Sequence, residues 1–383
     1  MKKVGILTHF YKSNNYGGVL QAYALVNCIN KSGIIAEQMR YPISPIAFSI
    51  KPKKHKVLKY LNPRNYFHFF LNKKNQFLKK TIFRKGFFLR RQSFDRFAKL
   101  ISQSDIVFNK NNIAKSADNY DIFITGSDQV WNMNWFDPNY FLEFVPDNKK
   151  KIAYAASMGH SSLTEEQKDY LKKVLPTFTA ISVREKDMVD LLQPLTDKKI
   201  EWVLDPTLLL DKGDWDEICP ERRIKEKYLF CYFLGHDKRI RKLAKRYAKK
   251  QNLKIVNLPH LAGIRKSDIG FGDYKLYDVA PEDFVSLIKY SNCIFTNSFH
   301  ACVFSLMYNK NFFAFNQLKM PSMATRLYSL CELFECQDHF CDVKEKFNMD
   351  YIEKIGQVDY NKNFDLLNEM KNKSMEFLNK NLD

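Results

Sequence analysis

The sequence predicts an α/β protein of two Rossmann-like domains with a cleft between them. The chain has 383 residues, which is more than one hydrophobic core usually supports. Hydrophobic residues make up 45% of it and aromatic residues 15%, enough for two packed interiors. Short apolar runs typical of buried strands alternate with helical segments along most of the chain, as in a doubly wound parallel sheet.

The first half of the chain opens as strand, turn and helix. Lys3–His9 predicts a buried strand, Asn14–Gly18 a turn, and Val19–Lys31 a helix that ends before Gly33. Thr164 and Gln167 form the pattern of a capping box, so a helix is expected to begin there. The other elements expected in this half are strands at Glu37–Tyr41, Asp121–Thr125, Lys151–Ser157, Ala180–Arg184 and Ile200–Asp205, and a helix at Glu185–Leu195.

A second alternating unit follows a break in the pattern. Pro206–Lys227 has no clean period and contains two prolines, so we expect the domain junction there. Beyond it, strands are expected at Tyr228–Gly235, Lys254–Pro259, Cys293–Ser298 and Asn311–Asn316, and helices at Asp237–Gln251, Pro281–Ser291, Phe299–Lys310, Ala324–Phe334 and Asn361–Asn381. The expected division is a first domain at 1–205 with a basic insertion at 43–100, a junction at 206–227, a second domain at 228–360, and a C-terminal helix at 361–383 that can pack back on the first domain.

The positive charge is concentrated in one segment. The chain has a formal net charge of +19, and residues 51–99 hold 16 of its 61 basic residues and one of its 42 acidic ones. Phenylalanines interleave with these cations, a composition that suits an anionic membrane surface. The alternative is a helical excursion that packs its phenylalanines onto the first domain. No nucleic-acid-binding module is recognisable, so we predict no nucleic-acid partner.

The cysteines and the N-terminal sequence indicate a cytoplasmic protein. The eight cysteines lie mostly in apolar runs, without a CxxC pair or a histidine at metal-ligand spacing, so we expect buried free thiols and no metal site. The apolar run near the N-terminus is too short for a signal peptide. No stretch of the sequence reaches the roughly 20 apolar residues of a membrane span. We therefore expect a cytoplasmic location, at most peripheral on the inner face of the cytoplasmic membrane.

Function is expected in the loops after the strands, because ligands of open parallel sheets bind at the carboxyl ends of the strands. Asn14–Gly18 contains two glycines that allow close backbone approach to a ligand, although it lacks the third glycine of a dinucleotide site and can equally be a structural turn. Asp128 follows a buried strand and can orient or deprotonate a hydroxyl; its alternative role is a turn or helix cap.

Two further strand ends carry chemistry-bearing side chains. Arg184 can hold a phosphate or carboxylate through two hydrogen bonds, or else pair with a neighbouring acid. His300 follows a strand and opens a helix, where an imidazole suits proton transfer, although a lone histidine is usually structural. The polar pair Asn297 and Ser298 in an apolar run favours the functional interpretation, because such groups need partners.

Six ordered blocks together resemble the polysaccharide pyruvyl transferase family over almost the whole chain. They are NYGGVLQAYAL at Asn15–Leu25, DIFITGSDQVWN at Asp121–Asn132, AYAASMG at Ala153–Gly159, ISVREKD at Ile181–Asp187, VLDPTLLL at Val203–Leu210 and FTNSFHACVFSLM at Phe295–Met307. The resemblance implies a fold like that of the two-domain GT-B glycosyltransferases. It also implies transfer of pyruvate from phosphoenolpyruvate to sugar hydroxyls as a ketal, in cell-surface polysaccharide biosynthesis.

The resemblance implies roles for individual residues. His300 matches the catalytic histidine of the family, and Asp128 is the expected partner in acid–base chemistry. The phosphoenolpyruvate is expected at the second domain, near Arg184, Asn297 and Ser298. Relatives often carry an arginine where this chain has Ser298, so Lys319 or Arg326 is expected to replace it. The saccharide acceptor, which can be lipid-linked, is expected against the first domain at Asn15, Tyr16, Gly17, Gly18, Ser127 and Gln129.

No cofactor besides the co-substrate phosphoenolpyruvate is expected. Two other functions share these features: a GT-B glycosyltransferase that uses a nucleotide sugar, and a catalytically silent scaffold of a polysaccharide assembly complex. The acceptor sugar, its pair of hydroxyls and the ketal stereochemistry are not specified by any motif.

Overall fold

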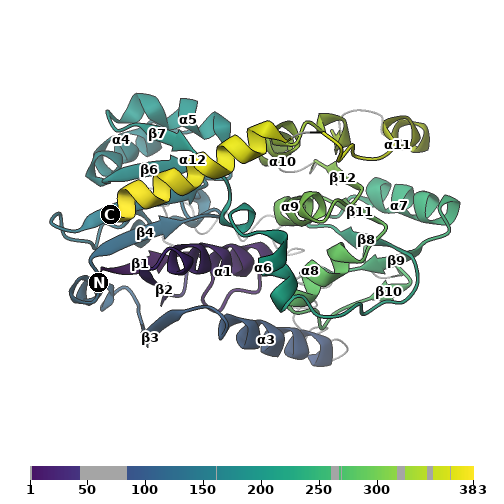
Figure 1. Cartoon of the computed structure of the whole chain (residues 1–383), viewed down its shortest axis with the longest axis horizontal. Coiled ribbons are helices and arrows are strands. Elements are labelled where there is room, and N and C mark those ends of the chain that lie inside the picture. The colour runs from purple at the N-terminus through teal and green to yellow at the C-terminus, as the bar shows by residue number, and fades with distance from the viewer. Residues whose placement is uncertain are drawn as a thin grey trace, which may run out of the picture.

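The computed structural model contains two parallel β-sheets flanked by helices (Figure 1). It describes residues 2–43, 84–160, 162–259, 267–268, 270–316, 324–342, 348–362 and 364–383. Every strand pairing in these described ranges is parallel, as expected for strands joined by helical crossovers. The predicted α/β fold class of two Rossmann-like units is confirmed.

The first sheet is formed by the N-terminal half of the chain, in the order β3-β2-β1-β4-β5-β6-β7. Its strands are β1 (Lys3–Leu7), β2 (Ile35–Arg40), β3 (Gln103–Val107), β4 (Ile122–Gly126), β5 (Lys150–Ala156), β6 (Ala180–Val183) and β7 (Ile200–Trp202). The associated helices are α1 (Tyr16–Lys31), α3 (Arg84–Ala98), α4 (Glu165–Val174) and α5 (Lys186–Leu192). The central strand β4 is buried along its whole length, which matches its apolar sequence.

The second sheet has the order β10-β9-β8-β11-β12-β13. Its strands are β8 (Tyr228–Tyr232), β9 (Lys254–Asn257), β10 (Tyr274–Lys275), β11 (Cys293–Thr296), β12 (Phe312–Phe315) and β13 (Phe340–Cys341). The helices that follow these strands are α7 (Lys238–Lys250), α8 (Pro281–Lys289), α9 (Phe299–Met307), α10 (Ala324–Leu333) and α11 (Met349–Ile355). Strands β8, β11 and β12 are buried at every position, so this sheet is covered on both faces.

Helix α1 begins earlier than the sequence pattern predicts. The Asn15 side chain accepts a hydrogen bond from the Gly17 amide at 3.1 Å and caps the helix. Tyr16, Gly17 and Gly18 therefore lie in the first turn of a helix, where a loop was expected. At the other end Gly33 adopts a φ of +84°, as predicted for a glycine that ends a helix.

The predicted junction contains a helix that the sequence pattern did not reveal. Helix α6 (Lys212–Ile218) carries Trp215, which is fully buried. The indole packs against Tyr23 of α1, with ring centroids 5.7 Å apart, and against Phe304 of α9 at 4.9 Å. One continuous hydrophobic core thus connects the two sheets through the junction.

Part of the basic insertion also belongs to this core. Phe94 and Phe97 of α3 are 2% and 0% exposed, and Phe94 packs against Tyr16. These two side chains are buried in protein and are not free to enter a membrane, so of the two interpretations the packing onto the first domain holds for them. Residues 51–83 of the basic segment lie outside the described residues.

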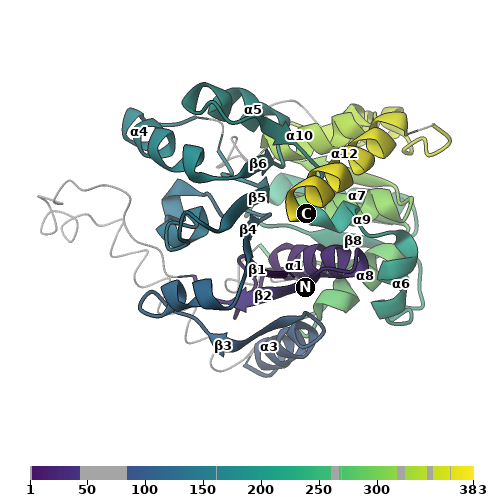
Figure 2. The same ribbon diagram turned by 60° about the vertical axis from the view of Figure 1, so that its left-hand side comes forward.

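The C-terminal helix α12 (Asp365–Leu382) returns from the second sheet to the first (Figures 1 and 2). Ser374 of α12 accepts a hydrogen bond from the Leu204 amide at 2.9 Å, and Phe377 packs on Tyr154 of β5. Among the helices of the described ranges, none is both long and apolar enough to cross a membrane.

Candidate active site

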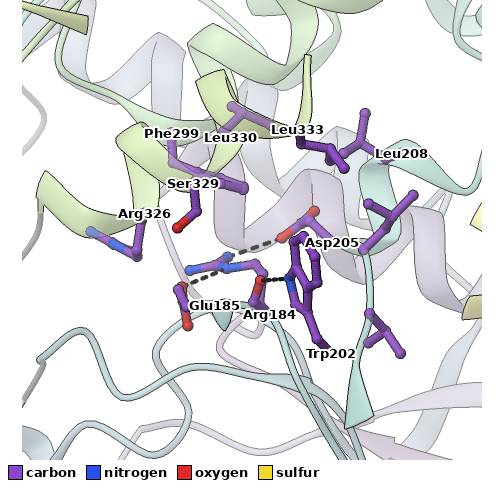
Figure 3. A pocket seen from close by; sticks show the side chains of 12 residues that line it. Arg184, Glu185, Trp202, Asp205, Leu208, Phe299, Arg326, Ser329, Leu330 and Leu333 are labelled. Carbon is purple, nitrogen blue, oxygen red and sulfur yellow. Dashed lines mark hydrogen bonds and ion pairs between the residues drawn. The ribbon is translucent and has the colours of Figure 1, made fainter. Parts of the chain in front are cut away.

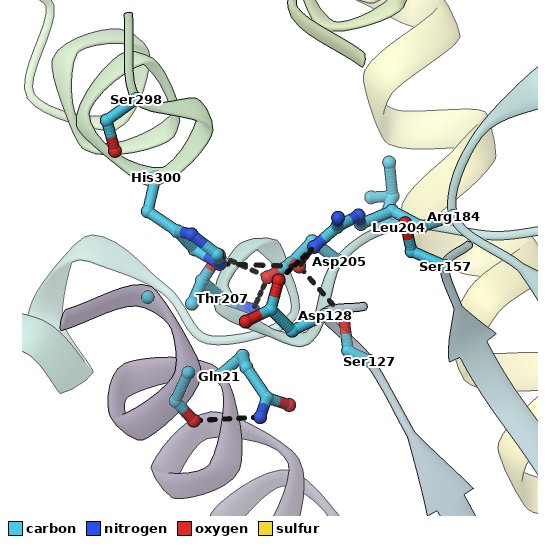
Figure 4. Close-up of polar contacts among 12 residues, drawn as sticks. Gln21, Ser127, Asp128, Ser157, Arg184, Leu204, Asp205, Thr207, Ser298 and His300 are labelled. Atoms are coloured by element: carbon cyan, nitrogen blue, oxygen red, sulfur yellow. Dashed lines mark hydrogen bonds and ion pairs between the residues drawn. The ribbon is translucent and has the colours of Figure 1, made fainter. Parts of the chain in front are cut away.

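Asp205 is the centre of a buried polar cluster where the two domains meet (Figure 4). Its side chain is fully enclosed and accepts hydrogen bonds from Ser127 Oγ at 2.9 Å and from Thr207 Oγ1 at 2.6 Å. Arg184 Nη1 lies 2.9 Å from its Oδ2 atom, and His300 Nε2 lies 3.6 Å from the same oxygen. Burial by itself raises the pKa of Asp205, but His300, Arg184 and Thr207 outweigh it and hold the pKa well below its usual range.

Arg184 is held by carboxylates, as the structural alternative predicts. Besides Asp205, its Nε atom donates to Glu185 at 3.0 Å, and Asp128 lies 4.0 Å from Nη1. The guanidinium also stacks over the Phe299 ring, 4.5 Å from its centroid. Burial opposes the charge, yet the three carboxylates raise the pKa of Arg184, so it stays cationic. Its Nη2 atom is buried and has no hydrogen-bond partner within the described ranges, which leaves this nitrogen for a ligand.

His300 reaches the cluster from the second domain, on the first turn of α9. One face of its imidazole lies against Gly17 of α1, where any β-carbon would overlap the ring. His300 is 7% exposed, and its buried Nε2 atom lies 3.6 Å from Asp205 Oδ2, too far for a hydrogen bond of ordinary length; no other described residue pairs with it. A histidine in this place can exchange a proton with a substrate bound beside Asp205.

Asp128 lies on the first-domain side of the cluster, after β4. Its backbone has a φ of +58°, in the left-handed region that aspartate tolerates better than most residues. Asn15 Nδ2 donates to Asp128 Oδ2 at 3.3 Å, and Gly18 packs close to the same carboxylate. The structure therefore brings the predicted residues Asn15, Gly18, Ser127 and Asp128 into one group with Arg184 and His300.

Arg326 of α10 lines a narrow cavity beside Arg184, Glu185 and Phe299 (Figure 3). The volume open to water-molecule centres is about 20 Å³. Burial and the neighbouring Arg184 charge lower the pKa of Arg326. Its Nε atom has no hydrogen-bond partner in the part of the chain that the structure describes. Of the two cations expected to replace the missing arginine, Arg326 is thus next to Arg184, whereas Lys319 lies outside the described residues.

Several predicted site residues are held by the fold instead. Tyr16 is 1% exposed, its hydroxyl donates to the Val279 carbonyl, and its ring stacks on Phe284, so the expectation that it contacts the acceptor is corrected. Asn297 accepts a hydrogen bond from the Leu234 amide at 2.6 Å. Ser298 caps α9 by accepting from the Ala301 amide. Gln129 accepts from Asn132 Nδ2 at 2.6 Å and is 9% exposed.

The sequence interpretation missed Asp205 and Glu185. Both lie just after strands, Asp205 in the VLDPT block and Glu185 directly after Arg184. Glu185 precedes α5 without capping it through its side chain, so an acidic residue that caps no helix was the available signal there. Asp205 also caps a short helical turn by accepting from the Thr207 amide at 3.0 Å, so it offered no such signal. Among the described residues, no group of three or more histidine, cysteine or acidic side chains could hold a metal ion.

His9 is a second buried histidine near the cluster. Its ring packs edge-on against Tyr140 at 4.4 Å, and no described residue pairs with its Nε2 atom. Burial lowers the pKa of His9 from 6.5 to about 4, although Asp128 and Asp137 oppose the shift. The imidazole is therefore neutral in the folded protein at neutral pH.

A pH dependence of stability follows from His9. Because the unfolded chain binds this proton more tightly than the folded one, stability falls as the pH drops below 6.5 towards about 4. We expect the wild type to lose about 2 kcal/mol more unfolding free energy than His9→Gln between about pH 7 and about pH 5. Urea unfolding of both proteins at the two pH values measures the difference. Equal losses would contradict a buried neutral His9.

The family relationship follows from comparison of the sequence with known families. A family model described as polysaccharide pyruvyl transferase matches residues 15–317. The chain belongs to the polysaccharide pyruvyl transferase family. In this pyruvyl transferase family member, the residues clustered around Asp205 all lie inside the matched range. Arg326 lies outside it. No curated protein sequence matches the chain.

Solved structures share the fold of this family member. The UDP-GlcNAc 2-epimerase of Methanocaldococcus jannaschii, in complex with UDP-GlcNAc and UDP, has a TM-score of 0.51 at 11% identity over 100% of this chain and 99% of that one. The UDP-GlcNAc 2-epimerase of Neisseria meningitidis bound to UDP-GlcNAc gives 0.50 at 11% identity, covering 99% and 100%. An α-glucosyltransferase in complex with UDP gives 0.50 at 9%, covering 100% and 96%. The predicted GT-B-like architecture is confirmed.

Proposed function

We propose that this protein transfers pyruvate from phosphoenolpyruvate to two hydroxyls of a sugar, as a ketal. The observation that carries the proposal is the meeting of His300 from the second domain with Asp128, Arg184 and Asp205 from the first, in a chain of this family. The acceptor is proposed to be an intermediate of cell-surface polysaccharide biosynthesis. Phosphoenolpyruvate serves as co-substrate, and no further cofactor is proposed.

The surroundings of His300 suit an anionic donor. The N-terminal turns of α1 and α9 meet at the Gly17–His300 contact, and neither turn contains an acidic residue. The positive ends of two helix dipoles therefore favour a phosphate or carboxylate there. Arg184 Nη2 and Arg326 Nε, which have no partner among the described residues, can donate to such an anion, and this supports these arginines as the donor-binding pair.

Donor binding requires the cavity to widen. A volume of about 20 Å³ accommodates roughly one water molecule, far less than phosphoenolpyruvate. The cavity has one wall from the first domain, with Arg184 and Trp202, and one from the second, with Phe299 and Arg326. We propose that these walls separate when the donor enters and close around it afterwards, which would exclude water from the reacting atoms.

The proposed reaction balances with two protonatable side chains. His300 gives a proton to the methylene carbon of phosphoenolpyruvate, and a sugar hydroxyl attacks the resulting cationic carbon while Asp128 takes the hydroxyl proton. The carbon–oxygen bond to phosphate then breaks, with its electron pair and the proton from Asp128 going to phosphate. A second hydroxyl closes the ketal and returns a proton to His300. Arg184 and Arg326 stabilise the phosphate charge.

The acceptor is proposed to lie against the first domain, near Asn15, Ser127 and Gln129. Ser127 and Asn15 already hydrogen-bond to Asp205 and Asp128, so a bound sugar would adjoin the proposed base. Contact of residues 51–83 with an anionic membrane is proposed from their basic and aromatic composition, which would bring the protein to a lipid-linked acceptor. The nucleotide-sugar and scaffold alternatives gain no specific support from the cluster.

Substitution of His300 tests the proposal. We expect His300→Gln to lower acceptor-dependent phosphate release from phosphoenolpyruvate by about 10² to 10⁴-fold, because the general acid is lost. Ser305→Ala, on the same helix, removes only an internal hydrogen bond to the Ala301 carbonyl and serves as the matched control that retains activity. Phosphate release at the wild-type rate by His300→Gln would exclude the assigned role.

A further inference from the structure

A second pocket lies on the second domain, between α7 and the residues Ser267, Gly270 and Phe271. Its volume open to water-molecule centres is about 330 Å³, against about 20 Å³ for the cavity beside Arg184. Small-ligand pockets have volumes of roughly 300–1,000 Å³, so it has room for a ligand. It is lined by Lys238, Arg241, Lys242, Lys245, Ser267, Gly270 and Phe271.

The rim of this pocket is strongly positive. Lys238, Lys242 and Lys245 are exposed on one face of α7, at helical positions i, i+4 and i+7. Within the described ranges, none of the three has an acidic partner, whereas Lys250 of the same helix pairs with Glu353. The cations at the rim are therefore available to a ligand.

One residue that lines the pocket, Arg241, is held by a buried ion pair with Asp268. Arg241 and Asp268 are 5% and 3% exposed, and Arg241 Nη2 donates to Asp268 Oδ1 at 2.6 Å. Among the residues that the structure describes, Arg241 Nε, Asp268 Oδ2 and Ser267 Oγ are buried and have no hydrogen-bond partner. Because buried polar atoms are rarely left unpaired, Arg241 and Ser267, which both line the pocket, can supply donors to an anion bound there.

We propose that this pocket is an anion site that binds a diphosphate group. The three lysines extend over seven residues of helix, a rise of about 10 Å, which exceeds what one phosphate can contact. Asp268 neutralises Arg241, so the rim leaves three positive charges, close to the charge of a diphosphate. A monocarboxylate would leave most of these cations unused.

The pocket is linked to the proposed active site through one loop. Arg241 donates to the carbonyls of Gly235 and Asp237, and the Leu234 amide at the start of this loop donates to Asn297. Asn297 precedes the helix that carries His300. If pyruvyl transfer is the function, a diphosphate here belongs to a carrier-linked saccharide acceptor. That assignment rests on the proposed function, whereas the anion site does not.

Binding of inorganic pyrophosphate, measured by calorimetry, tests the site. We expect Lys242→Glu to weaken pyrophosphate binding by at least about tenfold, because it reverses a charge at the centre of the rim. Lys249→Glu makes the same change on an exposed position of α7 outside the pocket and should leave binding unchanged. Equal affinity of the wild type and Lys242→Glu would overturn the proposal.

The source of the diphosphate is separated by two further probes. Uridine diphosphate in solution and phosphatidylcholine vesicles containing a polyprenyl diphosphate are each compared between the wild type and Lys242→Glu. If Lys242→Glu loses the interaction with one of these probes, the site is supported, and the probe that no longer binds identifies the carrier. His300→Gln should bind pyrophosphate like the wild type; if it loses binding while Lys242→Glu retains it, the anion occupies the donor site, and the inference fails while the proposed function stands.

Discussion

Asp205→Asn is expected to lower kcat/KM for pyruvyl transfer by about 10³-fold, within the range of mutations that disable acid–base machinery. The substitution keeps the shape of the side chain but removes the charge that pairs with Arg184 and faces His300. Because it breaks a buried ion pair, we also expect a loss of about 3 kcal/mol of unfolding free energy. Steady-state kinetics and urea unfolding measure the two effects.

Asp137→Asn is the matched control for this prediction. Asp137 is also buried in the first domain and accepts a hydrogen bond from the Tyr41 hydroxyl at 2.8 Å, but it belongs to a separate network. The control should lose stability and keep kcat/KM within about tenfold of the wild type, as expected for a substitution that does not move the reacting groups. Equal activity losses in the two variants would show that Asp205 matters only for folding.

Gly17→Ala is expected to lower activity by at least about 100-fold, because a displacement of about 1 Å at a reacting group can cost that much. A methyl group at this position would overlap the imidazole of His300, so either the ring or the interface between α1 and α9 must shift. We expect a stability loss of about 1–3 kcal/mol from overpacking. Activity and thermal unfolding are measured together.

Gly213→Ala provides the comparison for the glycine substitution. Gly213 lies in α6 with open space around its α-carbon, so alanine should be neutral or slightly stabilising. If Gly17→Ala were as active as Gly213→Ala, His300 would not be confined against α1, and the geometry described for the active site would be incorrect.

The sheets were predictable because their strands are buried on both faces. Runs such as Ile122–Gly126 and Cys293–Thr296 are apolar at nearly every position, and a buried parallel strand imposes that pattern locally. Edge strand β3 and helix α6 were not recognised, because exposed or short elements have weaker patterns. Trp215 of α6 is buried by two helices far away in sequence, which no local pattern reveals.

The residues of the candidate site were predictable where they directly follow a strand. Asp128, Arg184 and His300 follow β4, β6 and β11, so parallel topology brings them towards one edge of each sheet. Asp205 follows β7, and its importance depends on Arg184 and His300 converging on it from two domains. Tyr16 illustrates the converse: its glycine-rich surroundings indicate a binding loop, but its ring fills the interface with Phe284.

Mass spectrometry of a carrier-linked oligosaccharide incubated with the protein and phosphoenolpyruvate tests pyruvyl transfer most directly. We expect an acceptor product that carries one pyruvate ketal, formed together with an equal amount of phosphate and absent with His300→Gln. Two results would contradict pyruvyl transfer. One is a panel of cell-surface polysaccharide intermediates that bind the wild-type protein yet gain no pyruvate, and the other is a product that gains a sugar from a nucleotide donor instead.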